Sequence, residues 1–447
     1  VIRTVRPHLS RERITEAAFH AWGRTHFVQT SLNLVARELG VTKPALYRHF
    51  RSKDELLHAM EADYATRLLD FVVRPLRART AASGDATTGG QGADAAYERH
   101  LEDVVRLYLS SVFAFFDEHP FHYLFYVRTI LGRRRSTTGP VGDALREHDA
   151  LLLQLVDRPG SAIPEECLLT VARYLATSAA FWTTEHYRRS IGRPPAPGQT
   201  FEPEAVQLSR DEQQHLIEHG VRHVLHGFLA SAADVDREAV ERIAWIQPAE
   251  VRERPRVLDA ITRTVLEVGY GAATVERIAD RAGLSKSGLY HYFRNRDHML
   301  AETLIDGQRH FASLARTRFG QLGTHAERLY GLFVMISSYA HHEPSAVIVE
   351  NWLRESNIEV QIPGDHVVEL QRIYAFVSEM LVEGQLAGDP ENGFAILTFI
   401  NFLVMQELGN LDVRTARPDR LVDRIRGLFH LFADGAIPTL ESNGADS

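Results

Sequence analysis

The stretch GVTKPALYRHF at residues 40 to 50 returns as GLSKSGLYHYF at residues 283 to 293, an offset of 243 positions. The likeness continues without a gap over residues 13 to 57 and 256 to 300. The positions that recur include Ala17, Ala36, Gly40, Lys43, Leu46, Tyr47, Phe50, Arg51, Asp54 and Leu57. A period this long indicates a duplicated domain and not a solenoid of short repeats.

Each copy predicts short helices separated by a tight turn. In the first copy, Gly40 supplies the left-handed backbone that ends a helix over residues 32 to 39. Thr42 is then placed to cap a new helix, and its partner in the second copy is Ser285. Ser52 and Glu55 have the spacing of a capping box, which predicts the start of a further helix.

The helix that follows the turn has one apolar face. Leu46 and Phe50 lie four residues apart and are expected to face the core, which leaves Lys43, Ala45, Tyr47 and His49 to point elsewhere. Two helices joined by a short Gly turn, the second exposing polar residues near its N-terminus, are typical of a helix-turn-helix that reads the major groove of DNA. A helical hairpin packed only for stability is the alternative for one copy alone, and the presence of two copies favours the DNA reader.

Basic residues gather at the two copies. The chain of 447 residues has a net charge of −8, yet residues 1 to 60 hold ten Lys/Arg against five Asp/Glu, and residues 250 to 301 hold nine against seven. The three lysines of the chain, Lys43, Lys53 and Lys286, lie in or just after the repeated stretches. Basic segments in an acidic protein indicate that a polyanion binds there, and a compact ammonium suits contact with phosphate.

The remaining composition is that of a globular protein of two or three domains, with 45% hydrophobic and 24% charged residues. No window approaches the roughly 18 apolar residues of a membrane helix, and the N-terminal VIRTVRPHLSRERI lacks the apolar core of a signal peptide, so we expect a cytoplasmic location. The single Cys167 allows no internal disulfide. No phosphate loop, nucleophile elbow, spaced carboxylate pair or spaced metal-ligand set appears, so we expect no enzyme, cofactor or metal site.

These residues together resemble the DNA-binding domain of the TetR family of transcriptional regulators. The resemblance rests on a Thr or Ser before a Val-Ala or Ile-Ala helix, then Gly with Val or Leu and Thr or Ser, then Leu-Tyr-x-His/Tyr-Phe. It covers residues 13 to 57 and 256 to 300. It implies a regulator, usually a repressor, that binds a double-stranded DNA operator and is released by a small inducer.

The resemblance also implies which side chains contact DNA. Ser31 and Thr274 would donate to backbone phosphate, and Lys53 and Arg296 would hold a phosphate at the start of a later helix. The residues expected to face base edges or phosphate are Thr42, Lys43, Pro44, Ala45, Tyr47 and His49 in the first copy, and Ser285, Lys286, Ser287, Gly288, Tyr290 and Tyr292 in the second.

The region after each copy is apolar-rich and lacks strand alternation, so the expected fold class is all-α, with two TetR-like units. Long terminal helices are expected over residues 168 to 190 and 211 to 231, and over residues 392 to 412 and 419 to 434. The family pairs such helices from two subunits in a four-helix bundle. Because one chain holds both pairs, we expect an intramolecular pseudo-dimer that is monomeric in solution.

The expected domains follow from this repeat. They are a first DNA-binding domain at 1 to 56 (the first head), a helical regulatory and dimerisation domain at 57 to 232, a linker at 233 to 254, a second DNA-binding domain at 255 to 300 (the second head), and a second helical domain at 301 to 440. The first half is residues 1 to 232 and the second half is residues 255 to 440. Because the heads differ, with Pro44-Ala45 against Ser287-Gly288, we expect a non-palindromic operator, on which chains are able to assemble further.

The aromatic-rich stretch FAFFDEHPFHYLFYVRTI at residues 113 to 130 suggests an apolar pocket for a small inducer, although ordinary core packing explains it equally well. The expected lining residues are Phe116, Tyr123, Tyr126, Trp182 and His186, with Tyr339 and Trp352 in the second half. Two other classes of function stay open: an enzyme that turns over such a ligand, and a binding module whose second head has lost DNA affinity. Turnover of a ligand would support the enzyme, and a shallow salt dependence of DNA binding would support the module.

Overall fold

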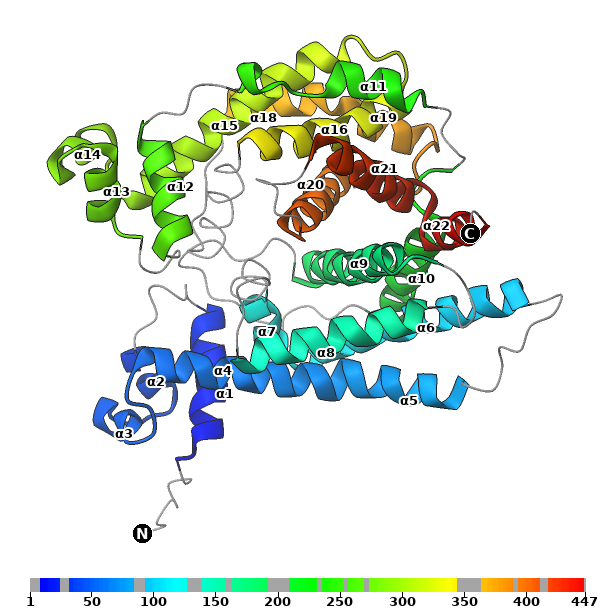
Figure 1. Cartoon of the computed structure of the whole chain (residues 1–447). Helices are drawn as coiled ribbons and strands as arrows, with labels where there is room; N and C mark the ends of the chain where they lie inside the picture. Colours follow the sequence, from blue (N-terminus) through cyan, green and yellow to red (C-terminus); the bar gives the residue numbers. More distant parts are fainter. Residues whose placement is uncertain are drawn as a thin grey trace. The chain divides into compact units, whose positions relative to one another are not determined.

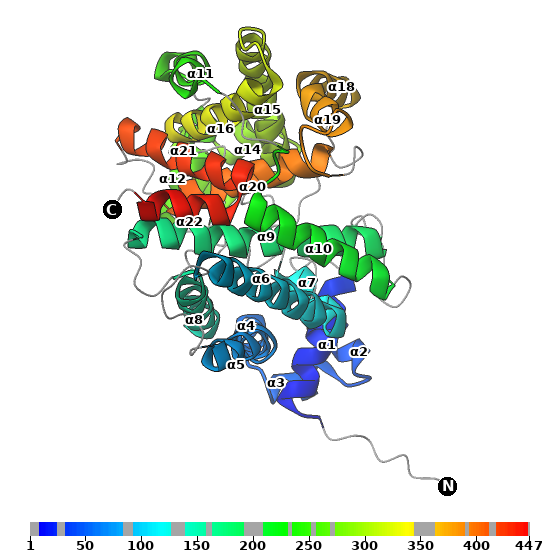
Figure 2. The ribbon, with the colours of Figure 1, turned by 90° about the vertical axis from the view of Figure 1, so that its right-hand side faces the viewer.

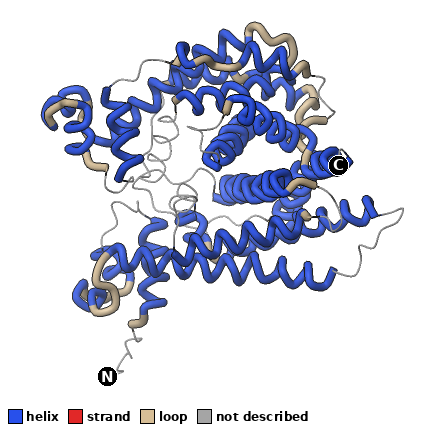
Figure 3. The backbone as a smooth tube through the Cα atoms, viewed as in Figure 1, coloured by secondary structure: helices blue, strands red, loops and turns tan. Residues whose placement is uncertain are grey.

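The computed structural model describes residues 9–24, 32–83, 93–126, 139–157, 163–191, 209–230, 235–251, 256–268, 273–343, 363–388, 393–410 and 417–445. Within these ranges the chain consists of helices and connecting turns (Figure 3), and the only β-type pairing is an isolated bridge between Leu229 and Leu386. None of the helices in these ranges is long and apolar enough to cross a membrane. The all-α class expected from the sequence is confirmed.

The first compact unit comprises Val1–Val156 and Trp182–Glu218. Its elements, of which the α-helices are labelled in Figure 1, are α1 (Arg11–Arg24), α2 (Leu32–Glu38), α3 (Lys43–Tyr47), α4 (Lys53–Leu68), the π-helical turn η1 (Leu69–Val73), α5 (Arg74–Ser83), α6 (Ala93–Glu118), α7 (Pro120–Phe125) and α8 (Gly139–Val156), with parts of α9 (Glu165–Ile191) and α10 (Arg210–His226). Figures 1 and 2 show α8 lying along α4, and α7 packs on α1. The first head therefore contacts the helical part of its own unit.

Helix α6 carries the core of this unit on one face. Leu101, Val105, Tyr108 and Phe115 recur at spacings of three, four and seven residues and are all buried. The Tyr108 hydroxyl forms a hydrogen bond of 2.8 Å with His148 Nε2 on α8, so this buried polar atom has a partner. The helical periodicity of the sequence thus predicts which face of α6 is covered.

The second compact unit comprises Asp157–Phe181 and His219–Ser447. Besides parts of α9 and α10, its elements are α11 (Arg237–Ala244), the 3-10 turn η3 (Pro248–Glu250), α12 (Arg256–Val268), α13 (Val275–Ala282), α14 (Lys286–Tyr292), α15 (Arg296–Phe319), α16 (His325–His342), α18 (Gly364–Ile373), α19 (Ala375–Val382), α20 (Gly393–Asn410), α21 (Pro418–Asp434) and α22 (Ala436–Ala445). Helix α16 contacts α11, α15, α19, α20 and α21, and every residue from Leu329 to Ala340 is buried. It is therefore the central helix of this unit.

Terminal segments of the first half pack against terminal helices of the second half inside this unit. The rings of Tyr174 and Phe181 on α9 lie 6.4 and 4.6 Å from the ring of Phe399 on α20, between centroids. Phe228, just after α10, stacks on Phe432 of α21 at 4.7 Å, and its N–H donates to the Phe432 carbonyl at 2.9 Å. The four terminal helices expected from the sequence are present, as α9, α10, α20 and α21, but α10 ends at His226 and not at residue 231, because Gly227 has a positive φ of 73°.

Two glycines allow the ends of α10 and α21 to meet. Gly227 follows α10 with φ at 73°, and a Cβ atom there would lie 2.1 Å from the carbonyl oxygen of Ala433. Gly435 follows α21 with φ at 88°, and a Cβ atom there would lie 2.4 Å from the backbone nitrogen of His226. Each helix therefore ends against the last turn of the other, at a distance that only glycine permits.

A buried ion network lies between the same helices. The Glu407 carboxylate on α20 is 7% exposed, and Arg424 on α21 donates to it at 3.1 Å. Arg173 on α9 lies 3.5 Å from the same carboxylate. Arg424 also donates to the Thr170 hydroxyl at 2.8 Å and pairs with Glu166, both on α9. Because a buried carboxylate is costly without partners, α9 helps to stabilise a charge that belongs to the second half.

His223, near the end of α10, is a buried neutral histidine. Its Nε2 donates to the Ala387 carbonyl at 3.1 Å, and its ring stacks on Phe228 at 4.3 Å. Burial lowers the pKa of His223 to about 3. The unfolded value is about 6.5. Since the folded pKa is the lower one, protons bind the unfolded chain first as the pH falls, so this contribution to stability is complete above about pH 6.5 and declines below it.

We therefore expect the free energy of unfolding to fall more steeply between pH 7 and pH 5 in the wild type than in the His223→Gln variant. A glutamine amide can keep a hydrogen bond to Ala387 and does not titrate. The expected difference is about 2 kcal/mol, at about 1.4 kcal/mol for each pH unit below the unfolded pKa. Urea unfolding of both proteins at the two pH values measures it, and an equal pH dependence would contradict it.

Candidate nucleic-acid interface

The first head consists of α1 to α4, and its turn has the expected geometry. Gly40 has φ at 63°, and the N–H of Val41 donates to the Ala36 carbonyl at 2.9 Å, which closes α2. Leu46 and Phe50 are both buried. The predicted Gly turn and the predicted core face of the following helix are therefore confirmed.

Helix α3 presents one polar face. Lys43, Pro44 and Tyr47 are exposed, and the Lys43 ammonium lies 5.6 Å from the centre of the Tyr47 ring. Ala45, which we expected to face the base edges, is instead only 9% exposed and belongs to the core. Successive residues on a helix are turned by about 100°, and Ala45 lies on the side of α3 next to the buried Leu46. His49 is half-buried at the end of this face.

Capping of the first head differs in detail from the sequence pattern. Thr42 stands at the N-cap of α3 with an extended backbone, but its hydroxyl makes no capping hydrogen bond. The Ser52 hydroxyl accepts from the Glu55 N–H at 3.0 Å, as expected, whereas the Glu55 carboxylate accepts from the Arg51 N–H at 2.7 Å. Lys53 follows at the first position of α4 and is half-buried, and burial lowers the pKa of its ammonium. The predicted phosphate contact Ser31 lies outside the described residues.

Arg11 of α1 holds the end of the recognition helix. Its guanidinium lies 4.1 Å from the centre of the Phe50 ring, donates to the His49 carbonyl, and pairs with Glu55 at 3.1 Å. One side chain thereby joins α1, the end of α3 and the first turn of α4. The role of Arg11 could not be predicted from the sequence, because its partners are 38 and 44 positions away and no spacing links them.

The second head repeats this construction in α12 to α15. Gly283 has φ at 67°. Thr274 caps α13 by accepting from the Arg277 N–H at 3.4 Å, and Ser285 caps α14 by accepting from the Gly288 N–H at 2.9 Å. The hydrophobic core contains Ala260, Ile261, Ala273, Ile278, Ala279, Ala282, Leu289, Met299 and Leu300. Both expected phosphate or base contacts, Thr274 and Ser285, therefore also serve as helix caps.

The exposed face of α14 carries Lys286, Ser287 and Tyr290, and the Lys286 ammonium lies 6.0 Å from the centre of the Tyr290 ring. Lys286 also pairs with Glu276 on α13. Their hydrogen bond raises the pKa of Lys286 and lowers the pKa of Glu276. The side chains of the remaining expected contacts, Tyr292 and Arg296, lie outside the described part of the structure.

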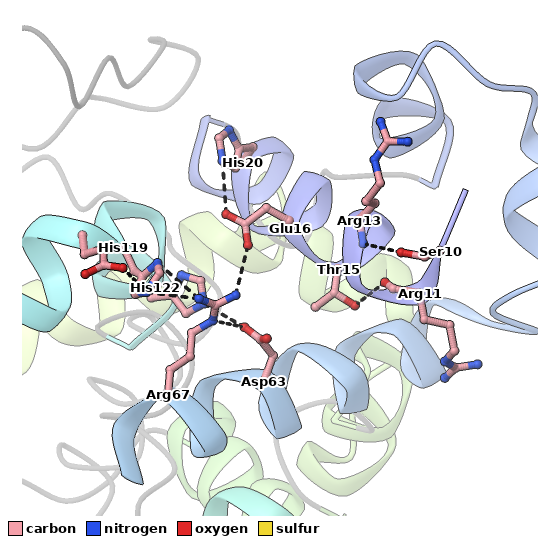
Figure 4. Close-up of polar contacts among 11 residues, drawn as sticks. Ser10, Arg11, Arg13, Thr15, Glu16, His20, Asp63, Arg67, His119 and His122 are labelled. Carbon is pink, nitrogen blue, oxygen red and sulfur yellow. Dashed lines mark hydrogen bonds and ion pairs between the residues drawn. The ribbon is translucent and has the colours of Figure 1, made fainter. Parts of the chain in front are cut away.

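A polar cluster joins the first head to the helical part of its unit (Figure 4). Asp63 on α4 accepts from Arg67 Nε at 2.7 Å and from His122 Nε2 on α7 at 3.0 Å. Glu16 on α1 pairs with Arg67 at 3.5 Å. The His122 ring is stacked on Phe19 of α1 at 3.8 Å. A displacement of α7 would therefore be transmitted to α1 and α4 through the same contacts.

The pKa shifts of His122 and Asp63 favour the hydrogen bond between them. Burial lowers the pKa of His122, although the Asp63 carboxylate acts in the opposite direction. Burial acts to raise the pKa of Asp63, but hydrogen bonds from His122 and Arg67 outweigh it and the pKa is lowered. At neutral pH a neutral imidazole therefore donates to an ionised carboxylate. This pair could not be predicted from the sequence, because its members are 59 positions apart.

The structure brings together three of the expected ligand-lining residues. Phe116 on α6 lies 5.5 Å from Tyr123 on α7 and 5.7 Å from Tyr126, between ring centroids. Trp182 on α9 is buried in the first unit, and Tyr339 on α16 is buried in the second. The side chain of His186 and the whole of Trp352 lie outside the described residues. Phe116, Tyr123, Trp182 and Tyr339 are buried and Tyr126 is half-buried, which core packing explains as well as a pocket wall does.

Comparisons with known proteins agree with the geometry of the two heads. The family model for bacterial regulatory proteins of the tetR family matches residues 14–60 and 257–303. The Fatty acid metabolism regulator protein of Bacillus subtilis (strain 168) is 24% identical over 153 residues, 32% of this chain and 76% of that protein. The HTH-type transcriptional regulator BetI of Serratia proteamaculans (strain 568) is 26% identical over 100 residues, 22% of this chain and 50% of that protein.

A third relative, the HTH-type transcriptional repressor KstR of Mycobacterium tuberculosis, is 32% identical over 81 residues, 17% of this chain and 37% of that protein. The structure of the transcriptional regulator FadR from Bacillus subtilis in complex with stearoyl-CoA covers 40% of this chain and 98% of its own, at 19% identity and a TM-score of 0.32, which is too low to support an argument. The chain thus spans about three quarters of one curated relative and half or less of the other two. These relatives are regulators and not enzymes, in agreement with the sequence analysis. Because the family model is matched at both copies of the repeat, this chain contains, in tandem, two domains similar to those of bacterial regulatory proteins of the tetR family.

Proposed function

We propose that the protein is a cytoplasmic transcriptional repressor that binds a non-palindromic DNA operator as an intramolecular pseudo-dimer. The observation that carries the proposal is the packing of α9 and the end of α10 against α20 and α21. A helix-turn-helix protein needs two heads about one helical turn of DNA apart, and it normally obtains them by dimerisation. Here the terminal helices of both halves pair within one chain, which supplies two heads without a second subunit.

The two heads present different side chains to DNA. Helix α3 exposes Lys43, Pro44 and Tyr47, whereas α14 exposes Lys286 and Ser287 beside its tyrosine. Base edges in the major groove are distinguished by the donors, acceptors and methyl groups that face them, so unlike recognition helices select unlike half-sites. A single chain with unlike heads has no reason to prefer an inverted repeat.

Selection of bound duplexes from a random pool with the purified full-length chain tests this proposal. We expect an asymmetric motif with two unlike half-sites. Lys43→Ala and Lys286→Ala are each expected to weaken one half-site only, and loss of one phosphate contact reduces the slope of log K against log[salt] by about 0.9. A perfect inverted repeat as the best site would show that two chains pair through like heads, and no enrichment would favour the functions that do not involve DNA.

We also propose that a small apolar ligand releases the operator. The rings of Phe116, Tyr123 and Tyr126 gather where α6 meets α7, and His122 on α7 is bound to Asp63 of the first head. A ligand among these rings would displace α7 and, through it, the head. One relative is named a fatty acid metabolism regulator, which makes a long-chain acyl compound the first to test on the selected duplex. Retention of the duplex at saturating ligand would exclude that class.

A further inference from the structure

The two heads differ in charge at one position beside the recognition helix. In the gapless alignment, Glu276 of α13 stands where the first head has Asn33 on α2, while Lys43 and Lys286 occupy matched places. The Glu276 and Lys286 side chains are 53% and 54% exposed, so solvent and DNA both have access to them. The second head therefore carries a carboxylate at a place where the first head is neutral.

Glu276 lies among groups that are expected to meet phosphate. Its carboxylate pairs with the Lys286 ammonium and accepts a hydrogen bond from Thr274, so it lies between the N-cap of α13 and the first residue of α14. In the first head, no ion pair of Lys43 occurs among the described residues, and its ammonium lies over the Tyr47 ring. Before DNA binds, Lys286 is therefore paired with the Glu276 carboxylate, whereas Lys43 has no carboxylate partner among the described residues.

We propose that Glu276 weakens the second head's contact with phosphate and thereby lowers the affinity of that head for DNA. Lys286 has to leave the carboxylate to give its full charge to the DNA backbone, and a carboxylate that stays near a phosphate repels it. The second head then binds weakly on its own and engages after the first head has found its half-site. This inference rests on the proposed function, in which both heads read DNA.

The test exchanges Glu276 and Asn33, which occupy the same position in the two heads. On duplexes that carry only the second half-site selected by the full-length chain, Glu276→Asn is expected to bind about threefold to tenfold more tightly than the wild type, with a salt slope steeper by a fraction of the roughly 0.9 that one full phosphate contact contributes. Glu276→Gln keeps the length of the side chain without its charge and is expected to act in the same direction. The reciprocal Asn33→Glu should weaken binding to the first half-site by a similar factor.

Lys286→Ala separates the failure of this inference from the failure of the proposed function. If Lys286→Ala weakens binding to the second half-site and Glu276→Asn does not strengthen it, the inference is wrong and the two-headed reader stands. If Lys286→Ala leaves binding to the second half-site unchanged, Lys286 makes no contact with DNA and the inference is overturned; if selection yields no second half-site, the second head does not read DNA and both proposals are overturned. In the Lys286→Ala background, Glu276→Asn is expected to lose most of its effect, and an undiminished effect would contradict a route through Lys286. Urea unfolding of each variant shows whether the second head is intact.

Discussion

Replacing Gly227 with alanine is expected to lower the free energy of unfolding by about 3 kcal/mol or more, from roughly 1–2 kcal/mol for a left-handed non-glycine residue and roughly 1–3 kcal/mol for overpacking. The new methyl group would lie 2.1 Å from the Ala433 carbonyl oxygen and 2.5 Å from the Asp434 nitrogen. Both obstacles are backbone atoms, so no side chain can turn aside to make room. The ends of α10 and α21 would have to move apart.

Gly384 provides a matched control in the same unit. It also has a positive φ, 71°, but a Cβ atom there would meet nothing within 4 Å. Gly384→Ala is therefore expected to cost only the conformational part, about 1 kcal/mol. Urea unfolding of the full chain, followed by circular dichroism, compares the two variants with the wild type. Equal losses would mean that the close approach of α10 and α21 contributes nothing.

The Gly227→Ala variant also tests the proposed intramolecular pseudo-dimer. Because the packing at Gly227 joins the two halves, Gly227→Ala is expected to weaken binding to the asymmetric operator more than binding to either half-site alone. Gly435→Ala places a methyl group against the backbone at the end of α10, and it is expected to weaken operator binding in the same way. Retained operator affinity in a destabilised Gly227→Ala protein would show that the heads do not depend on this contact for their spacing.

Replacing Arg424 with methionine is expected to destabilise the protein by about 3 kcal/mol, because removal of one partner of a buried ion pair leaves an uncompensated charge. Glu407 would keep only Arg173, at 3.5 Å, and α21 would lose its polar contacts to Thr170 and Glu166 on α9. Chemical unfolding of the full chain measures the loss.

Two further variants identify the cause. Adding Glu407→Leu to Arg424→Met removes the stranded carboxylate, and the double variant is expected to recover most of the loss, to within about 1 kcal/mol of the wild type. Arg417→Met removes a similar side chain from the start of the same helix, where its pair with Asp419 is well exposed, and it should cost at most about 0.5 kcal/mol. A double variant as unstable as Arg424→Met would show that the cost comes from lost packing of the arginine and not from the buried charge.

The local structure of both heads could be predicted from the sequence. Gly40 and Gly283 end their helices in the left-handed conformation, Leu46 and Leu289 are buried, and the Ser52 and Thr274 hydroxyls cap the helices that follow them. The all-α class and the four terminal helices were predictable for the same reason. Helix starts, helix ends and buried faces depend on residues within about four positions of one another, so spacing reveals them.

The functional contacts between elements were not predictable in this way. Ala45 is buried in spite of its place in the recognition helix, His122 reaches Asp63 from another helix, and Glu276 holds Lys286 across the turn. The charge at Glu276 was visible in the alignment of the two copies, but its partner was not. Exposure and pairing of a side chain depend on which helix faces meet, and that is set by packing over the whole unit.

By itself, the sequence determined that this chain contains two helix-turn-helix domains with different recognition helices, because turns, caps and apolar periodicity are local properties. Only the tertiary structure decided that α9 and α10 of the first half meet α20 and α21 of the second, through Gly227, Gly435 and the carboxylate of Glu407. Arg424 and Glu166 are 258 positions apart. Contacts at such separations form because burial of apolar faces and charges favours one particular pairing of helices, and no spacing along the chain records which pairing that is.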